Sequence, residues 1–440
     1  MACIAALAAP TVIWGATCPA RPVRSVTSPL IPSDVCIPDP FVNLTIDYFD
    51  DYSWRAFVAM VWPAAKGQRG VPDREKDVGA AGPRVFETYK SLWEIFHDDG
   101  SAPNPDFNSA GAAVDNACRA DAGFGGVVLA SKNGIDDIGQ AGIGELLGPL
   151  VAQNGRYVRY QTLYNRVEFD EIVRNKFYLR SNLPVVPSPR PDKPVFQFAN
   201  GSLAIKAAWL DMAGISRARR KRFYTRSAIV KDPATGKCSS VTVGLVGLHI
   251  VQKTPSRPQW IWSSFEQVDT APNFQGAVGT FTLNDGTPGP MPAENPLALV
   301  PLARQPAAPF NVIRSAQAPI HFDTSVTNRG YQELLRNTVW QYYKLVVTQW
   351  PLQPGNQALP VPATQTGEIF HTFPGTGPGT SAKSAFANLS METFDQGRPE
   401  LGCMSCHNQA RMGADFMWSV LDHAYPSTLA PAARETTAKR

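Results

Sequence analysis

The sequence lacks the features that mark membrane-spanning, nucleic-acid-binding and nucleotide-binding proteins. It contains no run of about 18 apolar residues, so we expect no transmembrane segment in the mature chain. Lys and Arg outnumber Asp and Glu by only 41 to 37, a surplus too small to indicate a nucleic acid partner. P-loop, dinucleotide-glycine and G-x-S-x-G patterns are missing, so nucleotide-binding and hydrolase functions have no support. The one dense basic stretch, residues 217–222, is either a solvated helix end or a docking patch for an acidic redox partner.

Histidine and cysteine are scarce, with six and seven residues, yet three of them form one compact motif. Cys403, Cys406 and His407 have the C-x-x-C-H spacing. Two thiols about one helical turn apart can reach both vinyl groups on one edge of a porphyrin. The adjacent imidazole then lies under the iron as the proximal ligand. The motif therefore predicts one covalently bound haem c, with Cys403 and Cys406 attached to it and His407 on the metal.

Two other interpretations of the same cysteines stay open. A zinc site could use Cys403 and Cys406, but a second Cys or His pair is missing, and a lone His423 or His371 would have to complete it. A thioredoxin-like dithiol would need a βαβ context, which the surrounding sequence does not indicate.

The sixth iron ligand is the open question at this motif. Met412 and Met417 follow His407 too closely to cross to the opposite face of the haem. We therefore expect the ligand to come from upstream, or from His423 by a sharp return, or to be absent. Met391 could supply a thioether, although core packing is its simpler role.

Distal-face candidates come from the middle of the chain. His249 lies in an apolar strand, where it is either a hydrogen-bonded core residue or a distal ligand or acid/base group of the haem. Glu266 could orient the His249 ring, or it could be a surface carboxylate. These two are the only catalytic candidates. His371, in a loop rich in Gly and Pro, is a second distal candidate. Phe416 and Trp418 are expected to pack on the porphyrin.

The other cysteines and the first residues indicate export. Cys18, Cys36, Cys118 and Cys238 form an even set that is compatible with two disulfides in any of three pairings, or with free buried thiols. The apolar run from residue 1 to 16 resembles a signal peptide without its basic n-region, as in a truncated or misassigned start. A buried N-terminal strand is the alternative. Export implies the periplasm of a Gram-negative bacterium.

The hydrophobic pattern predicts an α+β fold, with a mainly antiparallel sheet core, peripheral helices and a C-terminal C-x-x-C-H haem segment. We expect a signal peptide over 1–20, an extended arm over 21–45, an α+β body over 46–350, a Pro/Gly-rich connection over 351–384 and the haem segment over 385–440. Helices are expected after Asp51 up to Pro63 and over 85–96, 136–153, 158–177 and 331–349, and strands over 203–210, 241–252 and 259–266.

Two resemblances extend this interpretation. Residues 403–420 resemble cytochrome P460 and cytochrome c′-β, β-rich proteins with C-x-x-C-H near the C-terminus; the lysine cross-link of cytochrome P460 has no counterpart here. Over about residues 45–425 the chain resembles large single-haem bacterial proteins of the "cytochrome c family" type, which implies haem attachment and export. The segments that carry this likeness are 53–57, 206–209, 247–250, 260–266 and 391–393.

Three functions follow for such a chain. The simplest is one-electron transfer in the periplasm with a redox partner protein. The length of the chain before the motif also suits a haem-dependent oxidoreductase with an open distal site, acting on peroxide, a nitrogen oxide or a small organic substrate. Binding or sensing of a diatomic gas is the third.

Overall fold

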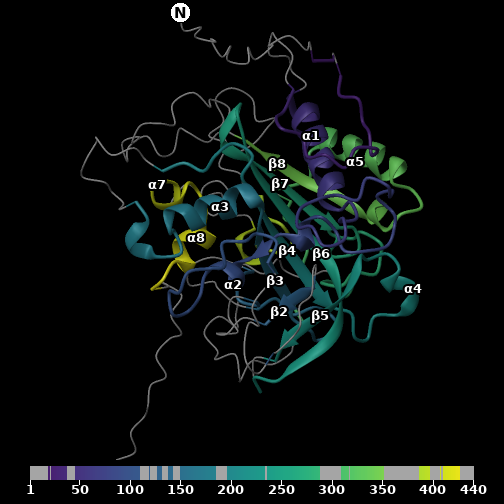
Figure 1. Cartoon of the computed structure of the whole chain (residues 1–440). Helices are drawn as coiled ribbons and strands as arrows, with labels where there is room; N and C mark the ends of the chain where they lie inside the picture. Colours follow the sequence, from purple (N-terminus) through teal and green to yellow (C-terminus); the bar gives the residue numbers. More distant parts are fainter. Residues whose placement is uncertain are drawn as a thin grey trace, which may run out of the picture.

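A computed structural model describes the fold, which is built on one large curled sheet (Figure 1). The described residues are 18–19, 21–36, 45–109, 118, 126–130, 137–141, 149–184, 196–232, 235–287, 309–316, 318–350, 386–396, 407 and 410–426. The expected signal peptide, apart from residues 18 and 19, and the expected connection over 351–384 lie outside these residues.

The sheet has eight strands, and six of its seven neighbour pairs are antiparallel. Only β2 and β5 run parallel. The path is β1-β3-β4-β6-β5-β2, and β7 and β8 continue the sheet from β6. The strands are β1 (Lys90–Ser91), β2 (Val127–Leu129), β3 (Val158–Tyr164), β4 (Leu203–Asp211), β5 (Thr225–Lys231), β6 (Cys238–Thr254), β7 (Arg257–Gln267) and β8 (Tyr343–Gln349). The α+β class and the mainly antiparallel sheet are confirmed.

Two helices, α1 (Thr45–Met60) and α5 (Phe322–Leu334), cover one face of β7 and β8 (Figure 1). Trp54 of α1 stacks on Tyr331 of α5 at 5.1 Å and meets Phe265 of β7 edge to face. Ser53 of α1 bonds Ser263 of β7 at 2.7 Å. Because side chains alternate along a strand, Ser264 and its neighbours two residues away point to the opposite face.

That opposite face, called the site face below, is covered by segments from the end of the chain. Asn388 donates to the Ser264 hydroxyl at 2.9 Å, so residues 386–396, with the short helix η9 (Thr393–Asp395), lie on this face. The helices α7 (Arg411–Ala414) and α8 (Trp418–His423) lie near α3 (Arg166–Asn175) in Figure 1. A bridge between Leu179 and Tyr425 ties the chain end to the turn after α3.

The sequence placed the long strands correctly and several helices wrongly. The expected helix over 85–96 is η1 (Phe86–Thr88), β1 and α2 (Leu92–Ile95). The helix expected over 158–177 is instead the strand β3 followed by the helix α3. The helix expected over 331–349 is instead the end of α5, then η6 (Val339–Tyr342), then the strand β8. Residues 137–141 and 149–153 of the helix expected over 136–153 are not helical. Two short helices, η4 (Arg180–Asn182) and α4 (Arg217–Arg220), complete the described part, and α4 carries most of the basic stretch.

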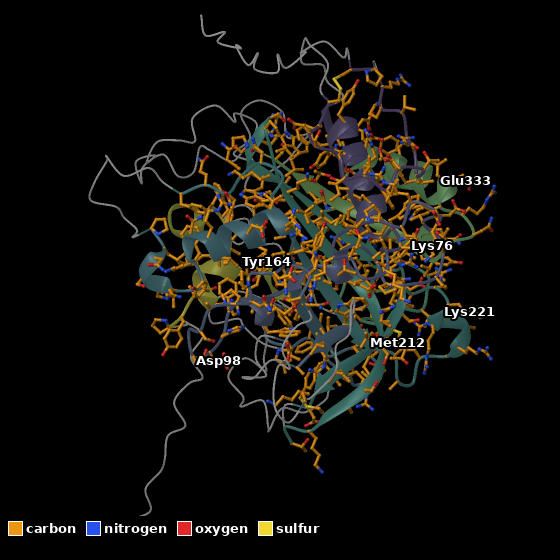
Figure 2. The ribbon with its side chains drawn as sticks, viewed as in Figure 1. Lys76, Asp98, Tyr164, Met212, Lys221 and Glu333 are labelled. Carbon is orange, nitrogen blue, oxygen red and sulfur yellow. A yellow bond between two sulfur atoms is a disulfide. The ribbon has the colours of Figure 1, made fainter. Side chains whose placement is uncertain are left out.

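Side chains fill the space between the sheet and its covering segments, with Tyr164 inside and Lys221 and Glu333 at the periphery (Figure 2). Two disulfides join Cys18 to Cys36 and Cys118 to Cys238, with Cα–Cα distances of 5.6 and 5.4 Å. A signal peptide over 1–20 would remove Cys18, so the first bridge requires cleavage before residue 18. Among the described helices, none is long and apolar enough to cross a membrane.

Candidate functional site

His407 is held by one backbone hydrogen bond and one aromatic contact on the site face. Its Nδ1 lies 2.7 Å from the carbonyl oxygen of Phe416. A carbonyl oxygen only accepts, so Nδ1 must carry the proton, and Nε2 keeps its lone pair. The imidazole ring lies 4.4 Å from the Trp262 ring, at an interplanar angle of 52°.

The acceptor carbonyl is placed by a tight turn between α7 and α8. Asp415 and Phe416 both have positive φ angles, 47° and 75°, which reverse the chain after α7. The buried Asp415 carboxylate fixes this turn, because it accepts from Lys253 Nζ at 2.7 Å and from the Phe198 amide at 2.9 Å. Burial raises the pKa of Asp415 to about 6, against the opposing effect of Lys253.

Three charged or polar side chains, Lys206, His249 and Glu392, lie together on the site face and are called the polar trio below; all three are near enough to affect the pKa of His407. Glu392 Oε2 is 3.2 Å from His249 Nε2, and Glu392 Oε1 is 3.3 Å from Lys206 Nζ. Lys206 and His249 are direct partners in the register of β4 and β6. The Lys206 ammonium also lies 5.2 Å from the centre of the Tyr160 ring.

Electrostatics link the trio to His407. Burial lowers the pKa of His407 to about 4; the Phe416 hydrogen bond and Glu392 oppose this shift, and Lys206 and His249 reinforce it. At neutral pH the ring is therefore uncharged, which is the form that ligates a metal. Burial would raise the pKa of Glu392, but His249 and Lys206 outweigh it and lower that pKa to about 2. Glu392 is therefore ionised at neutral pH.

The trio is only partly enclosed. The exposed fractions of the side chains are 25% for Lys206, 14% for His249 and 19% for Glu392. Met391, the neighbour of Glu392 in the sequence, is fully buried. A small molecule that reached this place would therefore meet an ammonium, an imidazole and a carboxylate together.

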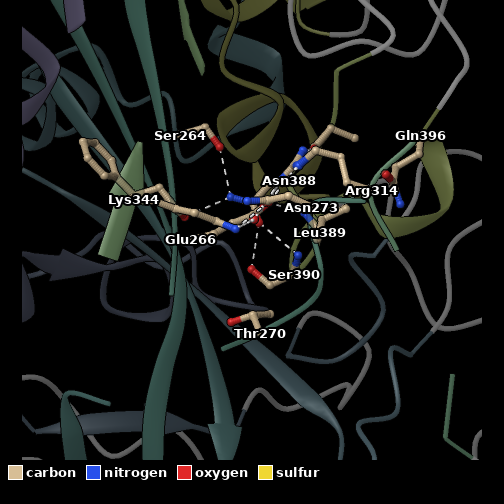
Figure 3. Close-up of polar contacts among 12 residues, drawn as sticks. Ser264, Glu266, Thr270, Asn273, Arg314, Lys344, Asn388, Leu389, Ser390 and Gln396 are labelled. Carbon is tan, nitrogen blue, oxygen red and sulfur yellow. Dashed lines mark hydrogen bonds and ion pairs between the residues drawn. The ribbon is translucent and has the colours of Figure 1, made fainter. Parts of the chain in front are cut away.

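Glu392, and not Glu266, is the carboxylate that bonds His249. Glu266 is completely buried, and both its oxygens lie 2.7 Å from Arg314 Nη2. It also accepts from the Leu389 amide at 2.7 Å and lies 3.5 Å from Lys344 Nζ (Figure 3). The suggestion that Glu266 is a surface carboxylate is wrong, and its assignment as the partner that orients His249 is corrected to Glu392.

Glu266 still matters for the site, because it anchors the segment that carries Glu392. Figure 3 shows Asn388, Leu389 and Ser390 gathered over Glu266 and Ser264. Asn388 Nδ2 donates to Ser264 Oγ at 2.9 Å and to the Phe265 carbonyl at 3.0 Å. Burial alone would raise the pKa of Glu266, but the positive charges of Arg314 and Lys344 have the larger effect and lower it.

The other sequence candidates are scattered. Cys403, Cys406 and His371 lie outside the described residues. Phe416 is buried in the main core cluster, and Trp418 begins α8 half-buried. His423 Nδ1 lies 2.9 Å from the Ser419 carbonyl oxygen, and Met391 packs in a second core cluster.

Sequence reasoning assigned no role to Lys206, Trp262 or Glu392. All three lie in segments that carry the family resemblance, which is the one signal that pointed to them. Their meeting depends on sheet register and on the docking of residues 386–396, which no local pattern reveals. Among the described residues, no group of three or more His, Cys, Asp and Glu side chains is arranged to hold a bare metal ion.

Comparison with known proteins gives no relative: no family model, no curated protein and no solved structure matches this chain.

Proposed function

We propose that this chain is an exported mono-haem c-type cytochrome that transfers electrons in the periplasm. Cys403 and Cys406 would hold one haem covalently, and His407 would coordinate its iron. The observation that carries the proposal is the state of His407: its Nδ1–H donates a hydrogen bond to the Phe416 carbonyl oxygen, so the lone pair of Nε2 is free to bind a metal. Histidines that ligate metals are fixed in this way, by a hydrogen bond from the other ring nitrogen.

The chain's own residues would hold and tune the group. When bound, the haem supplies a one-electron ferrous/ferric couple whose potential depends on its ligands and burial. Phe416 and Trp262 fix the plane of the His407 ring, and the Asp415–Lys253 pair fixes Phe416. The two disulfides support an oxidising compartment such as the periplasm.

Substitution of His407 tests the assignment of the ligand. The protein would be produced in a host that matures c-type cytochromes, and the absorption spectrum of His407→Ala compared with that of the unchanged protein. The variant should lose the spectrum of a haem with an axial imidazole. His97→Ala is the matched control, because it removes a partly exposed imidazole whose Nδ1 lies 2.9 Å from the Ser101 hydroxyl, and it should leave the spectrum unchanged. An unaltered spectrum in His407→Ala would contradict the proposal.

The polar trio favours a second candidate, a haem-dependent oxidoreductase with an open distal site. A partly exposed His249 held by Glu392 beside the proposed iron ligand is an arrangement suited to acid/base work on a small substrate. Its substrate class would be peroxide, a nitrogen oxide or a small organic molecule. A high-spin spectrum that changes quickly with CO or NO supports this candidate, and a low-spin spectrum that both gases leave unchanged supports electron transfer.

A further inference from the structure

Glu168 has an unusual environment for an acidic residue. It lies in the first turn of α3, is completely buried, and neither carboxyl oxygen has a hydrogen-bond partner among the described residues. Native proteins rarely leave buried polar atoms unbonded, so each such case needs an explanation.

The local sequence explains why the side chain points inward. Asn165 caps α3 by accepting from the Glu168 amide at 3.1 Å. A glutamate three residues after such a cap usually bonds back to the amide of the cap residue. Here the Asn165 amide donates instead to the Leu203 carbonyl of β4 at 2.9 Å. The Glu168 carboxyl therefore loses its local partner and turns into the interior.

Charged and titratable groups from several elements interact with Glu168 electrostatically. They are Asp415 of the turn before α8, Lys253 of β6, Glu171 of α3 and Tyr164 of β3. Burial raises the pKa of Glu168 well above its ordinary value of 4.5, Asp415 and Glu171 raise it further, and Lys253 opposes them. An isolated buried carboxylate costs several kcal/mol, so the group takes up a proton instead.

The neighbours of Glu168 connect it to His407. Asp415 is coupled to Glu168 by charge and bonds Lys253 at 2.7 Å. The next residue, Phe416, offers its carbonyl to His407 Nδ1. A change of charge at a metal on His407 would therefore act on Glu168 through a poorly solvated interior, where charges interact strongly.

We infer that Glu168 is a buried proton-binding site whose occupancy is linked to the oxidation state of the iron at His407. This inference rests on the proposed function. When a one-electron donor, the redox partner protein, reduces ferric iron to ferrous iron, the Glu168 carboxylate takes up one proton from water. When the iron gives up that electron, the carboxylic acid releases the proton, so the charge of the interior changes little in either direction.

The test combines two measurements on the haem-loaded protein, its Glu168→Gln variant and the control Glu171→Gln. Glu171 is on the same helix, but its carboxylate accepts from the Ala199 amide at 2.7 Å. The midpoint potential of the unchanged protein should fall as pH rises above the ordinary glutamate range. The steepest slope for one proton per electron is about 59 mV per pH unit, which corresponds to a tenfold change in the equilibrium constant. The slope should be lost in Glu168→Gln and kept in Glu171→Gln. A slope that persists in Glu168→Gln, or is missing from the unchanged protein, overturns the redox link.

The second measurement separates this inference from the proposed function. An infrared spectrum of the reduced protein at neutral pH should contain the C=O stretch of a protonated carboxylic acid that disappears in Glu168→Gln, and the chain without attached haem should show the same band. Absence of that band overturns the proton site itself. A chain without attached haem overturns the proposed function and the redox link, and the band then still decides whether Glu168 holds a proton.

Discussion

The Glu392 carboxylate contacts both other members of the polar trio, the Lys206 ammonium and the His249 ring. Glu392→Gln removes the charge that holds Lys206 and His249 at 3.3 and 3.2 Å. Because hydrogen bonds to charged groups contribute more than neutral ones, we expect a loss of about 2 kcal/mol in the free energy of unfolding. Urea denaturation at neutral pH measures it, and Glu333→Gln, in a surface ion pair with Arg336, should change little. Equal stability of Glu392→Gln and the unchanged protein would contradict the account of the trio.

Asp50, on the face of the sheet that α1 and α5 cover, should make the free energy of unfolding depend on pH. It accepts from Thr324 at 2.6 Å and Thr348 at 2.8 Å. Burial, with smaller effects of Asp47 and Asp323, raises its pKa to about 7 against these hydrogen bonds. Between the unfolded value of 3.8 and this folded value the native state binds the extra proton, so stability falls as pH rises through that window.

Asp50→Asn should remove this contribution. We expect the difference in unfolding free energy between variant and unchanged protein to shift by roughly 1.4 kcal/mol per pH unit inside the window, in favour of the variant as pH rises. Denaturation curves at several pH values measure the difference. Asp170→Asn, at an exposed position in α3, should leave the profile unchanged. A pH-independent difference between Asp50→Asn and the unchanged protein would show that Asp50 is ionised in the native state.

Single residues also show how far sequence reasoning reached. His249 was recognised because an imidazole in an apolar strand is conspicuous, and the structure brings it beside His407. Glu392 carries no such signal, because a glutamate near a turn is ordinary in any sequence. Its role depends on Glu266, more than a hundred residues away, which anchors Leu389.

At the scale of elements, Gly247 of β6 allows the segment over 386–396 to reach the sheet. A Cβ at this position would lie 2.1 Å from Ser390 Oγ and 3.2 Å from Met391 Cε. Gly247→Ala should therefore push the segment outward and cost roughly 1–3 kcal/mol of stability, as overpacking does.

Thermal or urea unfolding measures the cost of Gly247→Ala. Gly244→Ala in the same strand is the control, because its Cβ would meet mainly the flexible end of Met212, with the Phe223 Cβ at 3.2 Å as a milder contact. The control should lose less stability than Gly247→Ala. If both variants lose the same amount, the close approach at Gly247 is not what positions the segment.

The misassigned helices have a physical explanation at this scale. Every residue of β8 is buried, because helices cover one face and the C-terminal segment covers the other. Such a strand has no alternation of polar and apolar residues, so its apolar run was taken as a continuation of the helix before it. The strands β6 and β7 contain several β-branched and aromatic residues, such as Val243, Ile250 and Trp262, which indicate strands in the sequence; β4 has fewer, Ile205 and Trp209.

At the scale of the whole molecule, the two disulfides close loops of different size. Cys118 and Cys238 are 120 residues apart, and Cys18 and Cys36 are 18 apart. Loop-closure entropy gives about 5 kcal/mol for the longer loop and about 3 kcal/mol for the shorter one. Replacing each pair by serine should therefore destabilise the protein in this order, measured by urea denaturation without reductant. Mass spectra that show free thiols at all four cysteines would contradict both bridges.

The sequence predicted the fold class, the long strands, the even set of four cysteines and two histidines of the site, but not the cysteine pairing or the contacts that assemble the site. Those depend on contacts between distant parts of the chain, such as Asp415 with Lys253. Local patterns predicted the long strands but not the long-range contacts, because a contact follows from the register of the whole sheet.

The central claim is tested most directly by the mass of the tryptic fragment that contains Cys403 and Cys406, taken from protein made in a cytochrome-maturing host. We predict that this fragment carries the added mass of one haem, and that Cys403→Ser/Cys406→Ser protein carries none. A fragment of unmodified mass, from a host that loads haem onto a known cytochrome c in parallel, would contradict the account.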